Sequence, residues 1–240
     1  MRRVHFNLQG KGGVGKTWVA SLLAQHHART GEIARCFDTD PVNDSLSGWK
    51  GLNVERLELL DENDRIVERN LDRMMEAILT EDADFVVDCG AGAFLSLTSY
   101  LIENDVPAMI RDAGKELFVH PVVVGGEAMR HTSEGFVNLV RQMPPETQII
   151  LWANAFFGPI RYGDKELEEL AFYVENKSRV RGIVRLDREG TDTFREDLGQ
   201  LITSRLTFEE AQASPDFGIM AKQRLKQLQR RYMERMATVL

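Results

Sequence analysis

Short runs of hydrophobic residues alternate along the whole chain with longer amphipathic or polar stretches. This alternation is typical of an α/β fold, in which strands and helices follow one another. Several runs are apolar at consecutive positions, as expected for strands buried on both faces of a parallel sheet. The pattern predicts strands over residues 3–8, 33–38, 84–88, 117–124, 148–154 and 180–186, with a weaker strand over 54–60.

Apolar residues at helical spacing predict the connecting elements. The expected helices cover residues 16–29, 67–79, 95–103, 127–142, 163–176 and 207–240. There is no internal repeat and no linker-like segment, so the simplest division is a single domain over residues 1–240. Residues 207–240 then form a helical, basic C-terminal extension of that domain. We expect a mostly parallel central sheet flanked by helices.

The composition is that of a globular protein. Of the 240 residues, 43% are hydrophobic and 28% charged, and 19 Gly and 7 Pro are too few for a collagen-like or low-complexity chain. No stretch approaches the roughly 18 uninterrupted apolar residues of a membrane span, and residues 1–8 hold too short an apolar core for a secretory signal. We therefore expect a cytoplasmic protein.

The charge is distributed unevenly. The chain carries a net charge of −7, which argues against a protein that coats nucleic acid with its whole surface. Residues 216–240 carry +4, however, and residues 1–215 carry −11. This end of the chain has apolar residues at helical spacing, namely Leu225, Leu228, Tyr232, Met236 and Val239. Its basic face either stays in solvent or contacts DNA phosphates, an acidic protein partner or a membrane surface, which leaves peripheral association with DNA or a membrane open.

Two cysteines and one histidine are expected to have structural roles. Cys36 and Cys89 lie far apart without metal-ligand spacing, so we expect buried reduced thiols and no iron–sulfur cluster. His120 lies inside a predicted strand and is expected to pack there. Gly125 and Gly126 follow that strand and are interpreted as a turn into the next helix, with contact to a nucleotide or a partner as the alternative.

A glycine-rich loop joins the first predicted strand to the first helix. It matches the phosphate-loop pattern G-x-x-x-x-G-K-[ST]. Its residues are Gly10, Lys11, Gly12, Gly13, Val14, Gly15, Lys16 and Thr17, followed directly by Trp18. The glycines let backbone N–H groups point at phosphates, and the following helix contributes its positive end. Lys16 is expected to neutralise β- and γ-phosphate oxygens, and the Thr17 hydroxyl to bind Mg²⁺.

The same loop also fits a weaker, dinucleotide-binding pattern. Gly10, Gly12 and Gly15 satisfy G-x-G-x-x-G, and Asp38 follows at about the distance of a ribose-binding acid. In that fold, the residue after the third glycine packs closely against the sheet. Lys16 would then bury an unpaired charge, so the phosphate-loop interpretation is favoured.

The additional lysine at the start of the loop carries a family resemblance. Residues 11–17 resemble the deviant Walker A motif of the ParA/MinD family of P-loop ATPases, of the SIMIBI class. The resemblance implies bound ATP and Mg²⁺, and a homodimer in which Lys11 reaches the partner's nucleotide. The alternative for Lys11 is a solvated loop lysine.

Acidic residues at two predicted strand ends extend the resemblance. Asp38 and Asp40 precede Pro41 in a segment similar to the family's D-x-D-P switch I, which implies that Asp40 orients the attacking water and that Asp38 supports the Mg²⁺ shell. A turn-forming role remains open for Asp38. Asp88 ends an apolar strand, as in a Walker B motif, and should hold Mg²⁺ through water. Asn154 resembles the family's adenine-contacting asparagine, with a turn-forming Asn as the alternative.

Two segments depart from the family pattern. Val42 stands where the family often has Gln, and Gly90 and Ala91 follow the Walker B acid where the family has prolines. Nucleotide binding is therefore better supported than the details of the switches.

A closer resemblance extends over nearly the whole chain, to the TraL-type proteins of conjugative plasmids. The segments that carry it are residues 8–16, 38–43, 124–126, 152–154 with 158–160, 205–208 and 220–226. The resemblance implies a role in plasmid transfer or maintenance.

The functional hypothesis is a dimeric switch ATPase that hydrolyses MgATP slowly. In this hypothesis Lys11, Lys16 and Asp40 serve the reaction, Thr17, Asp38 and Asp88 serve the metal, and the loop with Trp18 and Asn154 binds the nucleotide. Two alternatives remain: a nucleotide-gated adaptor with negligible catalysis, and a biosynthetic ligase or kinase-like relative, which would need an acceptor pocket.

Overall fold

Eight parallel strands form the central sheet of the computed structural model, which describes residues 1–31, 34–59, 67–188 and 191–240. The strand order is β10-β7-β5-β1-β4-β2-β3, and β6 pairs with β7. In chain order the strands are β1 (Arg2–Asn7), β2 (Ala34–Asp38), β3 (Val54–Arg56), β4 (Asp84–Asp88), β5 (Lys115–Val119), β6 (Val122–Val124), β7 (Gln148–Asn154) and β10 (Val180–Leu186). The expected α/β architecture with a mostly parallel sheet is confirmed.

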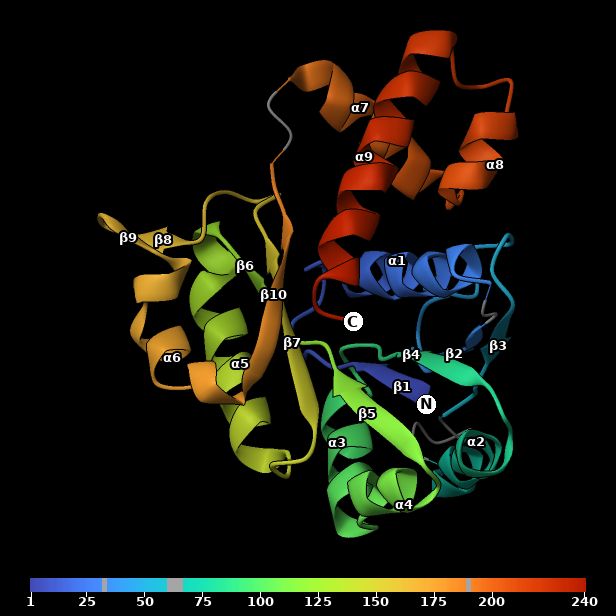
Figure 1. Ribbon diagram of the computed structural model, residues 1–240, viewed down its shortest axis with the longest axis vertical. Helices are drawn as coiled ribbons and strands as arrows, with labels where there is room; N and C mark the ends of the chain where they lie inside the picture. The colour runs from blue at the N-terminus through green and yellow to red at the C-terminus, as the bar shows by residue number, and fades with distance from the viewer. Residues whose placement is uncertain (32–33, 60–66, 189–190) are drawn as a thin grey trace.

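Helices cover both faces of the sheet (Figure 1). They are α1 (Lys16–Arg29), α2 (Glu68–Thr80), α3 (Phe94–Glu103), α4 (Val106–Asp112), α5 (Met129–Gln142), α6 (Ala171–Val174), α7 (Asp192–Thr203), α8 (Phe208–Ala213) and α9 (Ile219–Ala237). Helix α1 and the C-terminal helices α7 to α9 lie on one face, and α2 to α4 lie on the other, continued by α5 and α6 beside β6, β7 and β10.

Successive strand residues point to opposite faces and so fill separate cores. On β4, Phe85 and Val87 pack with α2 and α3, whereas Val86 packs on the face of α1. On β7, Leu151 packs towards α5 and Trp152 towards α1. These strands read as continuous apolar runs because both faces are covered.

The strand order places the glycine-rich loop at a change of direction in the sheet. β1 lies between β5 and β4, so the chain moves to opposite sides of β1 in its two halves. In open α/β sheets, ligands bind beyond the carboxyl ends of the strands at such a point. Residues 8–15 connect β1 to α1 there.

Several predicted elements differ from the observed ones. The strand expected over 117–124 is two strands, because Pro121 lacks an N–H and interrupts the ladder between β5 and β6. The helix expected over 163–176 is wrong. Those residues begin in the hairpin of β8 (Arg161–Tyr162) and β9 (Lys165–Glu166), whose turn has Gly163 at φ 58°, and continue through η2 (Leu167–Glu169) into the short α6. Ile33 and Leu60, the ends of two predicted strands, lie outside the described residues.

The C-terminal extension also differs from the single helix expected over 207–240. It is broken between α8 and α9, where Pro215 cannot continue a helix and Asp216 N donates to Ser214 Oγ at 3.1 Å. Helices α4 and α7 were not predicted. α4 is separated from α3 by Asp105, which adopts a left-handed conformation with φ 51°.

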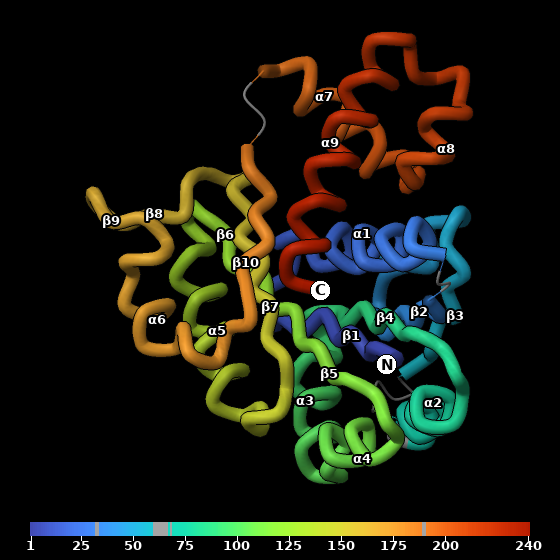
Figure 2. The backbone as a smooth tube through the Cα atoms, in the orientation of Figure 1, coloured from blue at the N-terminus to red at the C-terminus, as the bar shows by residue number. Residues whose placement is uncertain are grey.

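The last helix returns the chain to the sheet. Figure 2 shows α9 running from the top of the molecule back to the region of β10 and α1. There Arg181 Nε donates to the carbonyl of Val239 at 2.9 Å, and the Arg235 guanidinium donates to the carbonyl of Arg185 at 2.5 Å. The C-terminal residues are therefore fixed against β10.

A row of histidines is buried beneath α1. Trp152 Nε1 can only donate, and it lies 2.9 Å from His120 Nδ1, so this nitrogen accepts. In the neutral ring, His120 Nε2 then donates to His5 Nδ1 at 2.9 Å, and His5 Nε2 donates to His27 Nε2 at 3.0 Å. The His27 ring lies 3.7 Å from the Asp84 carboxylate. The packed role expected for His120 is confirmed, as part of a network.

Both cysteines are buried and reduced, as expected. Cys36 is 2% exposed and Cys89 is fully buried. Burial, together with a smaller effect of the nearby Asp88 carboxylate, raises the pKa of each thiol to about 12, so neither forms a thiolate at neutral pH.

Candidate nucleotide site

The loop between β1 and α1 has the backbone geometry of an anion-binding turn. Gly13 and Gly15 have φ of 74° and 96°, values that favour glycine over residues with a side chain. Gly15 is the N-cap of α1, and the first turn of that helix contains no acidic residue. The positive end of α1 and its free N–H groups therefore face the loop without a competing negative charge.

Lys16 lies folded within this loop. The residue is only 7% exposed, and its Nζ donates to the carbonyl of Lys11 at 3.0 Å. Burial lowers the pKa of Lys16, and the carboxylates of Asp88 and Asp40 oppose that shift. An anion in the loop would give this ammonium a stronger partner than the single carbonyl.

Thr17 and Asp88 are joined at the carboxyl ends of β1 and β4. Thr17 Oγ1 donates to Asp88 Oδ2 at 2.7 Å. Burial raises the pKa of Asp88 to about 7, against the lowering effect of the Thr17 hydrogen bond. The Asp88 carboxylate is thus held in a position where a cation would be needed to stabilise its full charge.

Asn7 is a site residue that the sequence reasoning missed. Its Nδ2 donates to the backbone carbonyl of Lys16 and lies 3.5 Å from Asp88 Oδ1. Its Oδ1 is buried and has no hydrogen-bond partner among the described residues. A polar side chain at the buried end of β1, just before the glycine-rich loop, is the signal that could have identified it.

The two acids of switch I both support their own loop. Asp38 is fully buried, and its carboxylate oxygens accept from the N–H groups of Asp40 at 3.0 Å and Ser47 at 2.8 Å. The turn-forming role that had been left open for Asp38 is therefore present in the structure. Its role in the Mg²⁺ shell stays a prediction.

Asp40 lies nearer the surface at the same edge. It accepts from the N–H of Val42 at 3.0 Å, the N–H of Asn43 at 3.2 Å and Ser45 Oγ at 2.8 Å. Burial by itself raises the pKa of Asp40, but these hydrogen bonds outweigh it and hold the pKa below its ordinary value. Asp40 is consequently a fixed carboxylate rather than a free one.

The switch segments are packed against one another. A Cβ added at Gly90 would lie 2.7 Å from the Asp40 Cα, whereas one at Gly92 would lie 3.8 Å from Pro41 Cγ. Only glycine therefore allows the segment after β4 to approach Asp40 this closely.

Asn154, at the end of β7, holds the loop from the other side. Its Nδ2 donates to the carbonyl of Val14 at 3.0 Å, and its Oδ1 accepts from the N–H of Phe156 at 3.1 Å. The second contact is the turn-forming role that the sequence left open. The proposed adenine contact remains a prediction.

Beside Asn154 is an apolar recess of about 190 Å³. It is bounded by the loop at Gly13 and Gly15, by Trp18, and by residues that the sequence reasoning did not assign to a site. These residues are Phe156, Phe157, Leu186, Asp187, Leu198, Ile202 and Tyr232. An apolar recess that opens from this glycine-rich loop has the position that a nucleobase would take if the loop held phosphates.

The C-terminal helices build part of this recess through an aromatic cluster. The Trp18 ring stacks on Trp49 with centroids 5.7 Å apart and meets the edges of Phe208 and Tyr232 at 5.7 and 6.4 Å. Trp18 therefore joins the loop, the segment after switch I, α8 and α9.

Lys11 is exposed, and its side chain forms no hydrogen bond or ion pair with the described residues. Two large apolar side chains near the site are exposed, Val42 after Asp40 at 75% and Leu95 in α3 at 74%. The structure thus brings together Lys16, Thr17, Asp38, Asp40, Asp88 and Asn154 around one loop and leaves the Lys11 side chain pointing to solvent.

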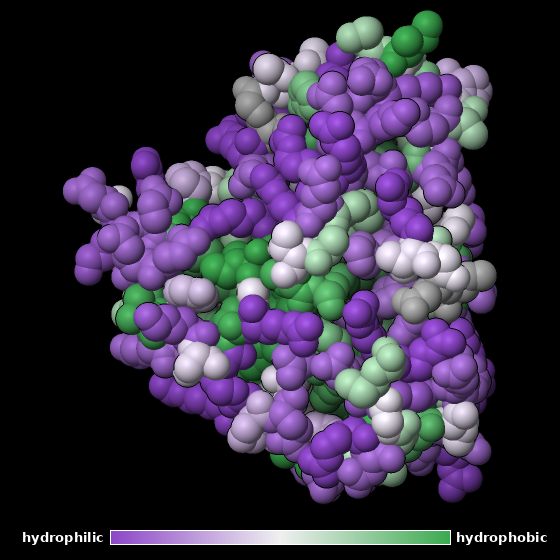
Figure 3. Space-filling view, viewed as in Figure 1, coloured by the Kyte–Doolittle hydropathy of each residue, from purple (hydrophilic) through white to green (hydrophobic). Residues whose placement is uncertain are grey.

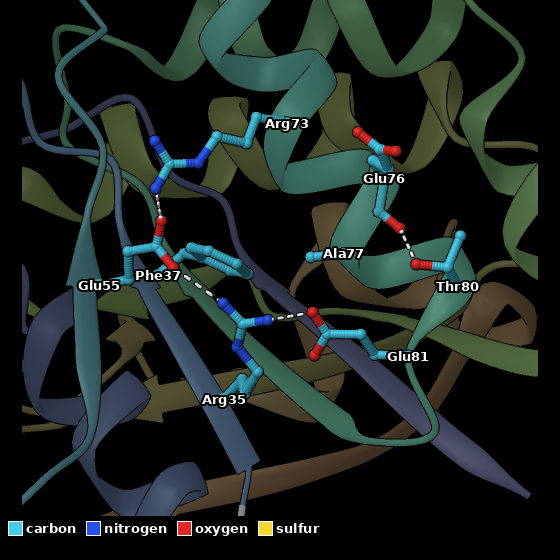
Figure 4. A pocket seen from close by; sticks show the side chains of 8 residues that line it. All are labelled: Arg35, Phe37, Glu55, Arg73, Glu76, Ala77, Thr80 and Glu81. Atoms are coloured by element: carbon cyan, nitrogen blue, oxygen red, sulfur yellow. Dashed lines mark hydrogen bonds and ion pairs between the residues drawn. The ribbon is translucent and has the colours of Figure 1, made fainter.

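A separate cavity of about 360 Å³ lies between α2 and the edge of the sheet, and none of the predicted site residues lines it (Figure 4). Arg35 lies between Glu81 and Glu55, with its NH2 group 2.8 Å from Glu55 Oε2, and Arg73 also pairs with Glu55. These charges satisfy one another, so the cavity shows no group left for a nucleotide.

The described residues contain neither a cluster of metal-ligating side chains nor a membrane-spanning helix. No cluster of three or more His, Cys, Asp or Glu side chains could hold a metal ion there. None of the helices in that part of the chain has the length and apolar character to cross a membrane.

No family model matches the chain, but curated relatives do. A "Protein TraL" of Escherichia coli is 43% identical over 226 residues, which cover 94% of this chain and 93% of the relative. A second E. coli "Protein TraL" is 40% identical over 236 residues, covering 98% of both. The chain belongs to the TraL family.

Solved structures agree with the fold of this TraL-family chain. It resembles a putative plasmid partition protein of Borrelia burgdorferi bound to AMPPNP, with a TM-score of 0.56, 13% identity and full coverage of both chains. A ParA family ATPase of Chlorobium tepidum gives a TM-score of 0.56 at 10% identity, covering 94% of this chain and 96% of the other. MinD of Aquifex aeolicus gives 0.52 at 17% identity with 98% of each chain covered. The fold is that of the ParA/MinD P-loop ATPases.

Proposed function

We propose that this TraL-family chain binds MgATP at the loop between β1 and α1, dimerises with the nucleotide at the interface, and hydrolyses ATP slowly as a switch in plasmid transfer or maintenance. The observation that carries the proposal is the 2.7 Å hydrogen bond from Thr17 Oγ1 to Asp88 Oδ2. It joins the hydroxyl that follows a glycine-rich loop to the carboxylate of the neighbouring strand. P-loop proteins present this pair of oxygens to Mg²⁺.

The residues present fit a bound magnesium nucleotide. Mg²⁺ keeps several waters and takes most other ligands from phosphates, so it needs few protein oxygens. Thr17 and Asp88 supply these, and because burial raises the pKa of Asp88 to about 7, a bound cation would stabilise its charged form. When bound, Mg²⁺ neutralises charge on the β- and γ-phosphate oxygens.

The chain's own groups divide the remaining work. The backbone N–H groups of the loop and the start of α1 bind the phosphates. Lys16 exchanges the Lys11 carbonyl for phosphate oxygens, and Asp40 holds the attacking water. Lys11, whose side chain points to solvent, completes the site of the second copy.

The place of this activity rests on the relatives. The two curated relatives carry the name TraL, and one structural neighbour is described as a plasmid partition protein. We infer a cytoplasmic plasmid-system protein with a protein partner. Contact with DNA or a membrane would involve the basic helix α9.

The decisive experiment is the solution mass of the protein with MgATP and with MgADP, run beside Lys11→Ala and the distant control Lys165→Ala. We expect a dimer with MgATP for the native chain and for Lys165→Ala, and a monomer for Lys11→Ala in both nucleotides. If the mass does not change with the nucleotide in any of the three proteins, the proposed dimeric switch is wrong.

A nucleotide-gated adaptor with negligible catalysis is the second candidate. The observation that favours it is the engagement of Asp40 by Val42, Asn43 and Ser45, which leaves this carboxylate fixed to its own loop. Tight ATP binding with turnover no faster than the protein-free background would select the adaptor.

A further inference from the structure

Helix α9 and the end of α1 form a second recess, on a part of the molecule that the nucleotide site does not use. It has a volume of about 240 Å³. Its lining is Arg29, Gln223, Lys226, Gln227, Gln229 and Arg230. The lining thus combines cationic and amide side chains and contains no acidic one.

Cations on two sides of α9 differ in their partners. On the side facing α7 and β10, Arg224 pairs with Asp197, and Arg235 pairs with Asp187 at 2.5 Å. On the side of the recess, Lys226 and Arg29 make no ion pair with any described residue, and Arg230 has only Glu234, at 3.7 Å on the exposed helix surface. An exposed pair of this kind contributes little, so the positive charge of the recess is largely uncompensated.

The floor of the recess can also hydrogen-bond. Gln229 is only 8% exposed, and the described residues provide no hydrogen bond to its side-chain amide. Gln223 and Gln227 are exposed on either side. Side-chain amides donate and accept at once, which suits a peptide backbone or a carboxylate side chain.

An apolar side chain continues the same face of α9. Residues three, four and seven apart share a helix face, so Ile219 lies in line with Gln223 and Lys226. Ile219 is 87% exposed, and the neighbouring Met220 is 64% exposed. Figure 3 shows a mostly hydrophilic surface over α9, with apolar side chains at the top of the helix. A phosphate backbone offers no apolar surface for an exposed isoleucine to pack against, whereas an apolar residue of a protein partner does.

The surroundings limit the length of the ligand. Glu234 lies one helical turn beyond Arg230, at one end of the basic side chains of the recess. Glu209 lines an adjoining recess that shares Arg29 and Gln229. Residues 1–215 carry a net charge of −11. A long polyanion would therefore be repelled by the acidic surface beyond these basic side chains, whereas a short acidic segment would not reach it.

We propose that this recess binds an acidic amphipathic segment of a partner protein, with carboxylates on Arg29, Lys226 and Arg230 and an apolar residue against Ile219. Lys226 and Arg230 are one helical turn apart, about 6 Å along the axis, which matches acidic residues one turn apart on a partner helix. The inference does not depend on nucleotide binding.

The test uses the full chain and a fluorescent helical peptide of about 20 residues, with glutamates along one face and leucines along the other. A DNA duplex and phosphatidylglycerol vesicles are the competing probes. Anisotropy is measured with and without MgATP, and binding in either state counts. We expect the peptide to bind more tightly than either competing probe.

Two matched pairs of variants locate the binding. Reversing both charges with Lys226→Glu and Arg230→Glu should weaken peptide binding about tenfold or more, while Lys165→Glu on the distant hairpin leaves it unchanged. Ile219→Ser should weaken binding several-fold even at about 0.5 M salt, because an apolar contact is not screened, while Met220→Ser has little effect. Thermal unfolding confirms that each variant is folded.

Peptide binding that ignores Lys226, Arg230 and Ile219, or no peptide binding, overturns the proposal. Tighter binding of the duplex or of the vesicles through the same residues overturns it in favour of a phosphate ligand.

Discussion

At the scale of single residues, the nucleotide site depends on side chains that are held by neighbours before any ligand arrives. Thr17 is tied to Asp88, and Asn154 to the loop at Val14. Lys16 rests on one carbonyl, which a phosphate would replace. Substitution of Lys16 therefore removes the positive charge that would pair with phosphate, while the folded chain loses only one hydrogen bond to a carbonyl.

We expect Lys16→Ala to weaken nucleotide binding about a hundredfold, since a charge-assisted contact to two phosphates is lost. Titration of a fluorescent ATP analogue measures this, with Lys165→Ala as the surface-lysine control. Binding by Lys16→Ala equal to that of the native chain would contradict the assignment.

Asp40→Ala should keep nucleotide binding and lose turnover, because this carboxylate orients water rather than phosphate. Phosphate release under saturating MgATP measures the rate. Equal rates of phosphate release in the variant and the native chain would contradict the proposed role of Asp40.

The buried histidines make the free energy of unfolding depend on pH. Burial lowers the pKa of His120 to about 3 and that of His5 well below its ordinary value. The unfolded chain, with histidine pKa values of about 6.5, therefore binds more protons than the folded chain in acid. The stability from these neutral rings is present above about pH 6.5 and is lost as the pH falls towards 3.

The expected loss in the free energy of unfolding is about 1.4 kcal/mol per histidine and pH unit below about pH 6. Urea unfolding at a series of pH values measures it. His131→Gln, at an exposed histidine, should show the same slope. A free energy that stays constant between about pH 7 and pH 5 would rule out the neutral histidine row.

At the scale of elements, the phosphate loop and the acids at strand ends could be predicted because their signal is local. A strand, a glycine loop and a helix follow one another in the sequence, and parallel strands bring Asp38 and Asp88 to one edge. The position of Asn7 at the end of β1 could have marked it, but its contacts with Lys16 and Asp88 could not be predicted, because they join different elements of the fold. The histidine row could not be predicted for the same reason. The walls of the apolar recess beside Asn154, such as Tyr232 and Leu198, come from helices far along the chain.

The contact between the two switch segments gives a prediction for glycine. Gly90→Ala places a Cβ 2.7 Å from the Asp40 backbone, so the segments must separate, and we expect a loss of about 1–3 kcal/mol in the free energy of unfolding. Gly92→Ala meets Pro41 only at 3.8 Å and should change it by less than about 0.5 kcal/mol. Equal effects in chemical denaturation would contradict this packing.

At the scale of the whole molecule, the C-terminal helices form one core with α1. Trp18, Phe208 and Tyr232 meet in the aromatic cluster, and Leu225 and Leu228 are fully buried in the same core. The extension is therefore continuous with the central fold. This packing supports the prediction of a single domain.

We expect one cooperative thermal transition for the full chain, and a calorimetric enthalpy equal to the van't Hoff enthalpy. Phe208→Ala should lower the stability by about 3–5 kcal/mol without splitting the transition. Two separate transitions in differential scanning calorimetry would show that the C-terminal helices fold by themselves.

The return of the chain end to β10 also bears on aggregation. β10 is the last strand on its side of the sheet, and an open strand is a template for pairing with another molecule. Arg235 occupies the carbonyl of Arg185, and Val239 lies against Gly182 and Arg181. The terminal residues thus cover part of the sheet edge, and we expect a chain from which a protease has trimmed them to associate more readily with other copies through β10.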